Sequence, residues 1–283
     1  MAIWGSTWLA ITFQLGRVAP EASVFYRFLL ASLLLFAYCR ARRLPLAYRP
    51  GQHAWIALQG ILMFGVSYIF VYYAEDNVVS GLVAVGYSAS PLLSMLGMRV
   101  FFGAPMTRAM TAGSILGIVG ITLVFWPEFA HLQGDRRTAV GAAYTVAAVV
   151  LSTLGSMTAH RNYQVQMPLW QNMAWGMLYG AIFSLGVSLA TGKSLAFEPS
   201  APYVLSLLYL AVLGSIVAFA AYLTLLKRIG AARAGYIGVM VPIVALVISA
   251  AFEGFRWHAL TGVGIAVSVA GNVIVLRRRS ATA

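Results

Sequence analysis

PLLSMLGMRVFFGAPMTRAMTAGSILGIVGITLV, residues 91–124, shares its skeleton with PIVALVISAAFEGFRWHALTGVGIAVSVAGNVIV, residues 242–275. Prolines, glycines and a few apolar residues recur at one constant interval without a gap: Pro91, Phe101, Gly103, Gly113, Gly120 and Val124 return as Pro242, Phe252, Gly254, Gly264, Gly271 and Val275. Because proline and glycine constrain the backbone and the closeness of helix contacts, this spacing predicts two copies of one structural unit.

The composition places both copies in a membrane. Of the 283 residues, 61% are hydrophobic and 9% are charged, and the mean hydropathy is +0.84. A soluble domain of this composition would expose large apolar patches. A helix needs about 20 apolar residues to cross the hydrocarbon, and such runs follow one another along nearly the whole chain. The sequence therefore predicts an all-α integral membrane protein, whose first apolar segment lacks the basic leader and cleavage site of a signal peptide.

Short polar joints divide the sequence into ten predicted transmembrane helices. They are residues 1–15, 20–39, 52–73, 78–100, 106–125, 138–160, 167–190, 202–226, 231–252 and 257–276. The first is short, roughly 22 Å at 1.5 Å per residue. The longest joint follows the fifth helix. We therefore divide the chain into a first five-helix repeat (residues 1–126), a connecting loop (127–137) and a second five-helix repeat (138–283).

The charges orient these helices. Loops on the side of the N-terminus hold most of the lysines and arginines, whereas all seven acidic residues fall on the opposite side. Basic loops stay in the cytoplasm, so both termini are predicted to be cytoplasmic and the connecting loop periplasmic. Because five helices per half is an odd number, the second copy enters the membrane upside down. Such inverted repeats hold substrate near the midplane of transporters; a duplication that serves packing alone is the alternative.

Residue types disfavour several other classes of function. Cys39 is the only cysteine, so an intramolecular disulfide and a multi-cysteine metal site are excluded. The net charge of +12 lies in loops, where membrane orientation explains it better than a nucleic-acid partner. An intramembrane enzyme needs a buried nucleophile and a base, and the sequence offers no such pair. We therefore expect a protein that is not an enzyme and needs no cofactor or metal.

Polar and aromatic residues near mid-membrane are candidates for a substrate site. Pro91 and Pro242 each free a backbone carbonyl. Each proline can serve as a hinge or a ligand contact, or it can produce an ordinary transmembrane kink. Deep tryptophans and tyrosines have polar tips that need partners, which a ligand pocket or core packing can supply. The predicted substrate-binding residues are Trp4, Ser6, Thr7, Trp8, Tyr68, Tyr72, Tyr87, Ser90, Pro91, Asn172, Trp175, Tyr236 and Pro242.

Arg27 is the only charge placed well inside a predicted helix. A buried intramembrane cation is a functional candidate, for instance for a carboxylate. At its shallow depth, snorkelling to the outer interface or a structural contact is favoured instead. No acidic residue is placed deep in a helix, and proton-coupled carriers commonly depend on a buried carboxylate. This favours facilitated diffusion or exchange over carboxylate-based coupling.

Glycines recur in the fifth and tenth predicted helices. Gly113 and Gly117 form a G-x-x-x-G pair, which permits close helix contact. We expect these two helices to be packing or dimer surfaces and not substrate lining.

The ten helices, Trp4-Gly5-Ser6-Thr7, the run Arg27-Phe28-Leu29-Leu30-Ala31 and the paired skeletons resemble the drug/metabolite transporter superfamily, and within it the EamA group of bacterial exporters. The resemblance covers nearly the whole chain. It implies an inner-membrane basket of two inverted five-helix repeats, with a central cavity formed mainly by helices one, three, four, six, eight and nine. Many relatives carry Gly-Glu after helix four or nine. Here Ala104 follows Gly103 and Glu253 precedes Gly254, so no role is carried over from that glutamate.

These features together predict export of aromatic or other bulky neutral amino acids and related metabolites by alternating access across a bacterial inner membrane. Apolar rings would stack on the deep aromatics, while hydroxyls, carbonyls near the prolines and Asn172 would serve the ammonium and carboxylate ends. The expected partners are a small-molecule substrate and membrane lipid, without nucleic acid, for a monomer or weak dimer. Transport of a drug, nucleobase or other metabolite is the nearest alternative, and a channel is a further one.

Overall fold

The computed structural model describes residues 2–131, 136–225, 236–254 and 257–278. The regular elements of these residues are all helices. In chain order they are α1 (Ala2–Thr12), α2 (Pro20–Ala41), α3 (Pro50–Gly60), η1 (Ile61–Val66), α4 (Ser67–Glu75), α5 (Ser80–Gly86), η2 (Tyr87–Ala89), α6 (Ser90–Phe102), α7 (Arg108–His131), α8 (Arg136–Gln164), α9 (Leu169–Ala190), α10 (Ala201–Tyr209), η3 (Leu210–Val217), α12 (Tyr236–Phe252) and α13 (Ala259–Arg278). Elements η1 and η3 are π-helical turns, and η2 is a 3₁₀ turn.

Six helical segments of the described chain are long and apolar enough to cross a membrane. They are Pro20–Ala41, Pro50–Glu75, Ser80–Phe102, Arg136–Gln164, Leu169–Ala190 and Ala201–Leu225. Large apolar side chains such as Leu33, Val146 and Leu205 are exposed on their outer faces, where lipid would cover them. The prediction of an all-α membrane protein is confirmed. The number of ten spans and the inverted arrangement stay predictions.

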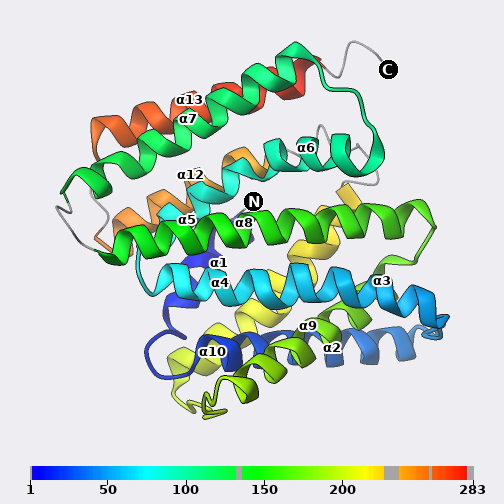
Figure 1. The fold of residues 1–283 in the computed structure, drawn as a ribbon. Helices are drawn as coiled ribbons and strands as arrows, with labels where there is room; N and C mark the ends of the chain where they lie inside the picture. The colour runs from blue at the N-terminus through cyan, green and yellow to red at the C-terminus, as the bar shows by residue number, and fades with distance from the viewer. Residues whose placement is uncertain (1, 132–135, 226–235, 255–256, 279–283) are drawn as a thin grey trace.

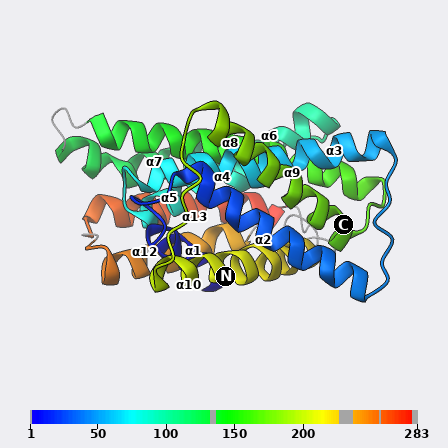
Figure 2. The ribbon, with the colours of Figure 1, turned by 90° about the horizontal axis from the view of Figure 1, so that it is seen from below.

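Most of the helices run along a common direction and form layers, whereas the Ala201–Leu225 segment crosses them obliquely (Figure 1); Figure 2 shows the bundle from below. Helix α7 packs on α13 at one edge of the molecule, and α2 packs on α9 at the opposite edge. Helices α1, α4, α8 and α12 lie between these two pairs. The short α1 contacts α12, η3 and α5, so it sits where elements from distant parts of the chain meet.

Prolines and glycines set the ends of the helices. Helices α2, α3 and α10 each have a proline in the first turn, where its missing N–H has no helical partner to lose. Gly103 ends α6 with a φ of 65°, and Gly254 follows α12 with a φ of 71°. Glycine adopts this left-handed conformation without steric cost. These two glycines are counterparts in the sequence skeleton, so their shared spacing has a backbone cause.

The two prolines of the skeleton affect their helices differently. Pro91 lies in the first turn of α6, directly after the 3₁₀ turn η2, so the Ser80–Phe102 segment changes its helical geometry at this point. Pro242 lies inside α12 and is buried. The side chain of Pro91 lies outside the described part of the structure. Both prolines therefore mark interruptions of the regular hydrogen-bond pattern within long apolar segments.

Helices α7 and α13 approach until their backbones touch. A Cβ atom on Gly264 would lie 2.6 Å from the carbonyl oxygen of Gly120, and one on Gly271 would lie 2.6 Å from that of Gly113. Such distances exclude any side chain without a shift of one helix. These glycines thus allow close contact between two helices of the same chain. Of the two expected roles, packing or a dimer surface, packing explains them.

Candidate functional site

Helix α1 carries two tryptophans that contact different parts of the bundle. The Nε1–H group of Trp4 donates to the carbonyl oxygen of Gly214 in η3 at 3.2 Å, and its ring centroid lies 5.2 Å from that of Phe219. One turn later, the Trp8 ring lies 5.2 Å from the Tyr87 ring in η2. A π-turn departs from the regular helical hydrogen-bond pattern. Trp4 therefore supplies a donor at a place where the backbone of η3 is irregular.

The hydroxyls between these tryptophans are already engaged. Ser6 Oγ lies 2.6 Å from the hydroxyl oxygen of Tyr209, and Thr7 Oγ1 donates to the carbonyl oxygen of Trp4 at 2.8 Å. Thr7 is buried against η3, because a Cβ atom on Gly214 would lie 2.8 Å from its methyl carbon. Ser6 and Thr7 thus join α1 to the Ala201–Leu225 segment.

Arg27 is buried in the protein, with 1% of its surface exposed. Its Nε–H donates to Ser215 Oγ at 3.0 Å, and its guanidinium carbon lies 4.5 Å from the ring centroid of Tyr68 and 5.1 Å from that of Phe28. The snorkelling interpretation is therefore wrong, because the helices of the bundle cover the whole side chain. The structural contact is present. Arg27 Nη1 has no hydrogen-bond partner among the described residues, so the two N–H groups on this nitrogen of a buried cation are open.

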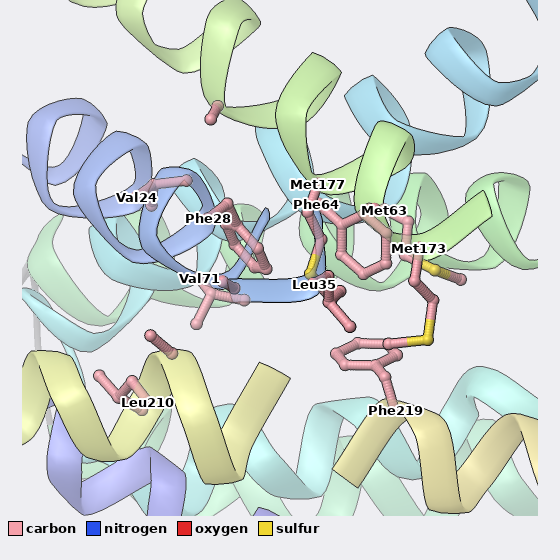
Figure 3. Close-up of a cluster of buried hydrophobic side chains, with 14 of the residues drawn as sticks. Val24, Phe28, Leu35, Met63, Phe64, Val71, Met173, Met177, Leu210 and Phe219 are labelled. Carbon is pink, nitrogen blue, oxygen red and sulfur yellow. The ribbon is translucent and has the colours of Figure 1, made fainter. Parts of the chain in front are cut away.

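A series of aromatic rings crosses the bundle beside Arg27. Ring centroids lie 5.2 Å apart for Trp4 and Phe219, 5.1 Å for Phe219 and Phe64, 5.3 Å for Phe64 and Phe28, and 4.9 Å for Phe28 and Tyr68. Figure 3 shows the three phenylalanines brought together from α2, η1 and the helix that continues η3. We call these five residues the aromatic series.

Sequence reasoning missed the three phenylalanines of the aromatic series. A phenylalanine has no polar tip, so in a membrane sequence it cannot be told from a side chain that faces lipid. The Arg27-Phe28 run was the one available signal, because a ring next to a buried cation can contribute a cation–π contact.

Helix α4 and η2 supply the remaining tyrosines. The Tyr72 hydroxyl donates to Gln14 Oε1 at 2.6 Å and is fully buried, while both Tyr68 and Tyr72 interact with Arg27. Tyr87 contacts the Trp8 ring. Within the described residues, Trp8 Nε1 and Ser90 Oγ are buried without a hydrogen-bond partner. Buried polar atoms usually have partners, so the described residues leave the hydrogen-bonding capacity of these two atoms unused.

Two predicted site residues are engaged elsewhere. Asn172 Nδ2 donates to Gln59 Oε1 at 3.0 Å, and Asn162 Nδ2 donates to the same oxygen at 2.9 Å, which ties α3, α8 and α9 together. Trp175 Nε1 donates to the carbonyl oxygen of Leu46, in the loop between α2 and α3, at 3.0 Å. The structure thus does not bring Asn172 and Trp175 into contact with the tryptophans of α1. The side chain of Tyr236 lies outside the described residues.

Two acidic side chains are buried within the protein, which the sequence did not predict. Glu21, in the first turn of α2, is 2% exposed, and Glu75, the last residue of α4, is 7% exposed. Tyr73 donates its hydroxyl to Glu21 Oε1 at 2.6 Å. The inference that the chain lacks a buried carboxylate is therefore wrong. Both acids sit at helix ends, where hydropathy places them in loops, but neighbouring helices cover them.

Comparison with protein families decides the class of the chain. The model of the EamA-like transporter family matches residues 1–126 and 139–277. The chain belongs to this family. Because family members and relatives are named as transporters, the protein is a membrane transporter and not an enzyme. Two separate segments match one family model, and they fall on either side of the connecting loop.

Individual relatives agree with this assignment. The chain is 29% identical to the uncharacterized inner membrane transporter YedA of Escherichia coli K12, over 96% of this chain and 87% of that protein. It is 28% identical to a probable terminal-alkyne amino-acid exporter of Streptantibioticus cattleyicolor, over 84% and 75% of the two chains. One solved crystal structure, 18% identical, has the same fold, with a TM-score of 0.74 over 99% of this chain and 95% of its own.

Proposed function

We propose that this transporter exports aromatic or other bulky neutral amino acids and related metabolites by alternating access, through facilitated diffusion or exchange. The observation that carries the proposal is the open Nη1 donor of the buried Arg27 beside the aromatic series. A guanidinium binds a carboxylate with strong, charge-assisted hydrogen bonds, and aromatic side chains pack well against another ring. A substrate with a carboxylate and a ring matches both features.

The rest of the site supports a substrate with a polar head and an apolar tail. In this proposal Arg27 holds the carboxylate, and the rings of Trp8, Tyr68 and Tyr87 contact the substrate's side chain. Ser90 Oγ and the carbonyl groups near Pro91 and Pro242 then supply hydrogen-bond acceptors to part of the ammonium group. Ser6, Thr7 and Tyr72 support the site from outside it. The hydroxyls of Ser6 and Tyr72 bond to other segments of the chain, and the Thr7 methyl group packs against η3. The name of one relative supports the same kind of substrate, because that protein is called a probable terminal-alkyne amino-acid exporter.

Alternating access requires two halves, and we propose ten spans in two inverted five-helix repeats. Residues 1–126 and 139–277 each match the family model, which supports the division. The contacts between helices are also symmetric, because α2 packs on α9 and α7 on α13, and each of these pairs joins counterparts of the two halves. The π-turns η1 and η3 fall in the third and eighth predicted helices, which are counterparts too.

The proposal includes location and assembly. We infer a bacterial inner membrane as the site, because relatives are named inner membrane transporters, with both termini in the cytoplasm and a monomer or weak dimer as the working form. Cytoplasmic termini follow from the distribution of basic loops. A reporter that fluoresces only in the cytoplasm, fused to Ala283, tests the orientation; a dark fusion in cells that make the protein contradicts it.

Uptake into liposomes tests the substrate. Purified protein is reconstituted and loaded with unlabelled phenylalanine, and entry of labelled phenylalanine or tryptophan is followed. Saturable uptake above that of empty vesicles is expected, and uptake equal to empty vesicles removes the amino-acid proposal. A panel of unlabelled drugs and nucleobases as competitors separates the nearest alternative, another small cargo. Ion currents in a planar bilayer would identify a channel, which the proposal excludes.

A further inference from the structure

Glu75 is a buried acidic residue. It ends α4, and neither of its carboxyl oxygens has a hydrogen-bond partner in the described chain. The C-terminal end of a helix carries partial negative charge, which repels a carboxylate. An ionised carboxylate that is buried without a partner costs so much free energy that such groups become neutral instead. The position therefore suits a carboxyl group that holds a proton.

The charged neighbours of Glu75 do not neutralise it by contact. Glu253, after α12, interacts with it as a like charge, and Arg27 of α2 interacts with it as an opposite charge. Glu253 accepts from the N–H of Ser80 at 3.3 Å and from the Ser80 hydroxyl, so its own charge is stabilised. Within the described residues Arg27 and Glu75 form no ion pair within 4.0 Å. Ser215 and ring faces hold the guanidinium instead.

The other titratable groups that interact with Glu75 are the hydroxyls of Tyr72 on α4 and Tyr87 in η2. Tyrosine hydroxyls are uncharged at neutral pH, and the Tyr72 hydroxyl donates to Gln14 and not to Glu75. These groups therefore supply no positive charge. A proton is what remains to neutralise Glu75 in this conformation.

Glu21 shows the contrasting arrangement in the same bundle. It is as deeply buried, but it lies in the first turn of α2, where the helix dipole favours a negative charge. The Tyr73 hydroxyl donates to one of its oxygens at 2.6 Å. Its other oxygen, Oε2, has no hydrogen-bond partner among the described residues, but the donor on Oε1 and the place at a helix start distinguish Glu21 from Glu75 and make it a matched control.

We propose that Glu75 is the proton-exchanging site of the transport cycle, and that its carboxyl group carries in turn a proton and the ammonium group of a substrate whose carboxylate Arg27 holds. The identity of that substrate rests on the proposed function. One carboxyl group cannot hold both cations, so the O–H bond of Glu75 breaks as the ammonium binds, and the proton passes to water. Protons and amino acid then cross in opposite directions, so carboxylate-based coupling takes the place of the facilitated diffusion or exchange proposed above.

The first experiment needs no substrate. Infrared difference spectra of the purified full-length protein between acidic and alkaline pH report the C=O stretch of buried protonated carboxyl groups. A band is expected in the wild type, lost in Glu75→Gln, shifted in Glu75→Asp and retained in Glu21→Gln. If Glu75→Gln elutes as an aggregate, the band shift in Glu75→Asp decides. A band that neither change at Glu75 affects overturns the proposal.

The second experiment measures coupling in liposomes. With an acidic interior and an alkaline medium, exchange drives labelled phenylalanine inward above its external concentration. We expect such accumulation for the wild type and for Glu21→Gln, whereas Glu75→Gln should only equilibrate phenylalanine across the membrane. Equal accumulation by Glu75→Gln overturns the proposal. In a further outcome the wild type transports no phenylalanine, while the infrared band of the wild type is still absent from Glu75→Gln. That combination contradicts the amino-acid proposal and supports the proton site.

Discussion

Replacing Arg27 by glutamine removes the one buried charge that the proposed function assigns to the substrate's carboxylate. A hydrogen bond to a charged group contributes about 1.5–3 kcal/mol, and each 1.4 kcal/mol corresponds to a tenfold change in affinity. We therefore expect the Kd for phenylalanine to rise about 10- to 100-fold in Arg27→Gln.

The effect on stability should be smaller, because two terms oppose each other. The substitution loses the hydrogen bond from Nε to Ser215 and the cation–π contacts with the rings of Phe28 and Tyr68. A desolvated cation–π contact contributes about 2 kcal/mol. It also removes the cost of burying a charge that lacks a full set of partners. Thermal unfolding should therefore change little while affinity falls.

Binding of two related ligands separates the carboxylate contact from a general loss of the site. Phenethylamine has the ring and the ammonium group of phenylalanine but no carboxylate. Direct binding to detergent-purified protein should show that Arg27→Gln weakens phenylalanine and leaves phenethylamine unchanged. Arg17→Gln is the matched control, since Arg17 is exposed and pairs with Glu198 on the surface. Equal losses for both ligands in Arg27→Gln would refute the assignment of the carboxylate to Arg27.

Three further tests, two of them with a matched control substitution, address the packing and the site. Gly264→Ala puts a Cβ atom 2.6 Å from a backbone oxygen of α7 and should destabilise the protein by about 1–3 kcal/mol. In the control Gly262→Ala the new Cβ atom meets nothing within 4 Å, so the change should be neutral or stabilise the protein by up to about 1 kcal/mol. Thermal unfolding measures both. Phe219→Ala opens the aromatic series and should cost about 3–5 kcal/mol, whereas the exposed Phe252→Ala should stay within about 0.5 kcal/mol; equal unfolding midpoints would contradict the burial. Ser90→Ala removes a hydroxyl that has no hydrogen-bond partner in the described part of the chain. Unfolding should therefore be unchanged while phenylalanine binding weakens, and unchanged binding would remove Ser90 from the site.

Backbone-determined features could be predicted from the sequence. Gly103 and Gly254 have the same left-handed conformation because each follows an apolar helix, and their chemistry permits it. Gly264 and Gly120 meet because glycine spacing on two helices matches one close contact. The left-handed turns depend on a residue and its own helix, which a single sequence contains. The glycine contact also depends on which helices meet, and the sequence left open whether these glycines serve packing or a dimer surface. The turns η1 and η3 escaped prediction, since nothing local distinguishes a π-turn from a regular helical turn.

The positions of Arg27, Glu75 and Asn172 could not be predicted, because the residues that decide them are remote in sequence. Ser215, which accepts from Arg27, is on η3, and Gln59, which accepts from Asn172, is on α3. Glu75 precedes an acidic and polar joint and therefore resembles a loop residue. Whether neighbouring helices cover a helix end is a property of tertiary packing, and hydropathy along the chain does not report it.

The buried ionisable groups Arg27 and Glu75 also bear on which state of the transporter is low in energy. An uncompensated charge inside a protein costs about 3–5 kcal/mol, and an ion pair between Arg27 and Glu75 would remove that cost within one conformation. The fold holds them apart, because Ser215 fixes Arg27 while Glu75 ends a different helix. A zwitterion placed between them satisfies both at once, whereas a proton on Glu75 satisfies only one. The loaded site is therefore expected to be stabilised against the empty one by its electrostatics, and neutral ring-bearing ligands without a zwitterionic head should fail to stabilise the protein against heat.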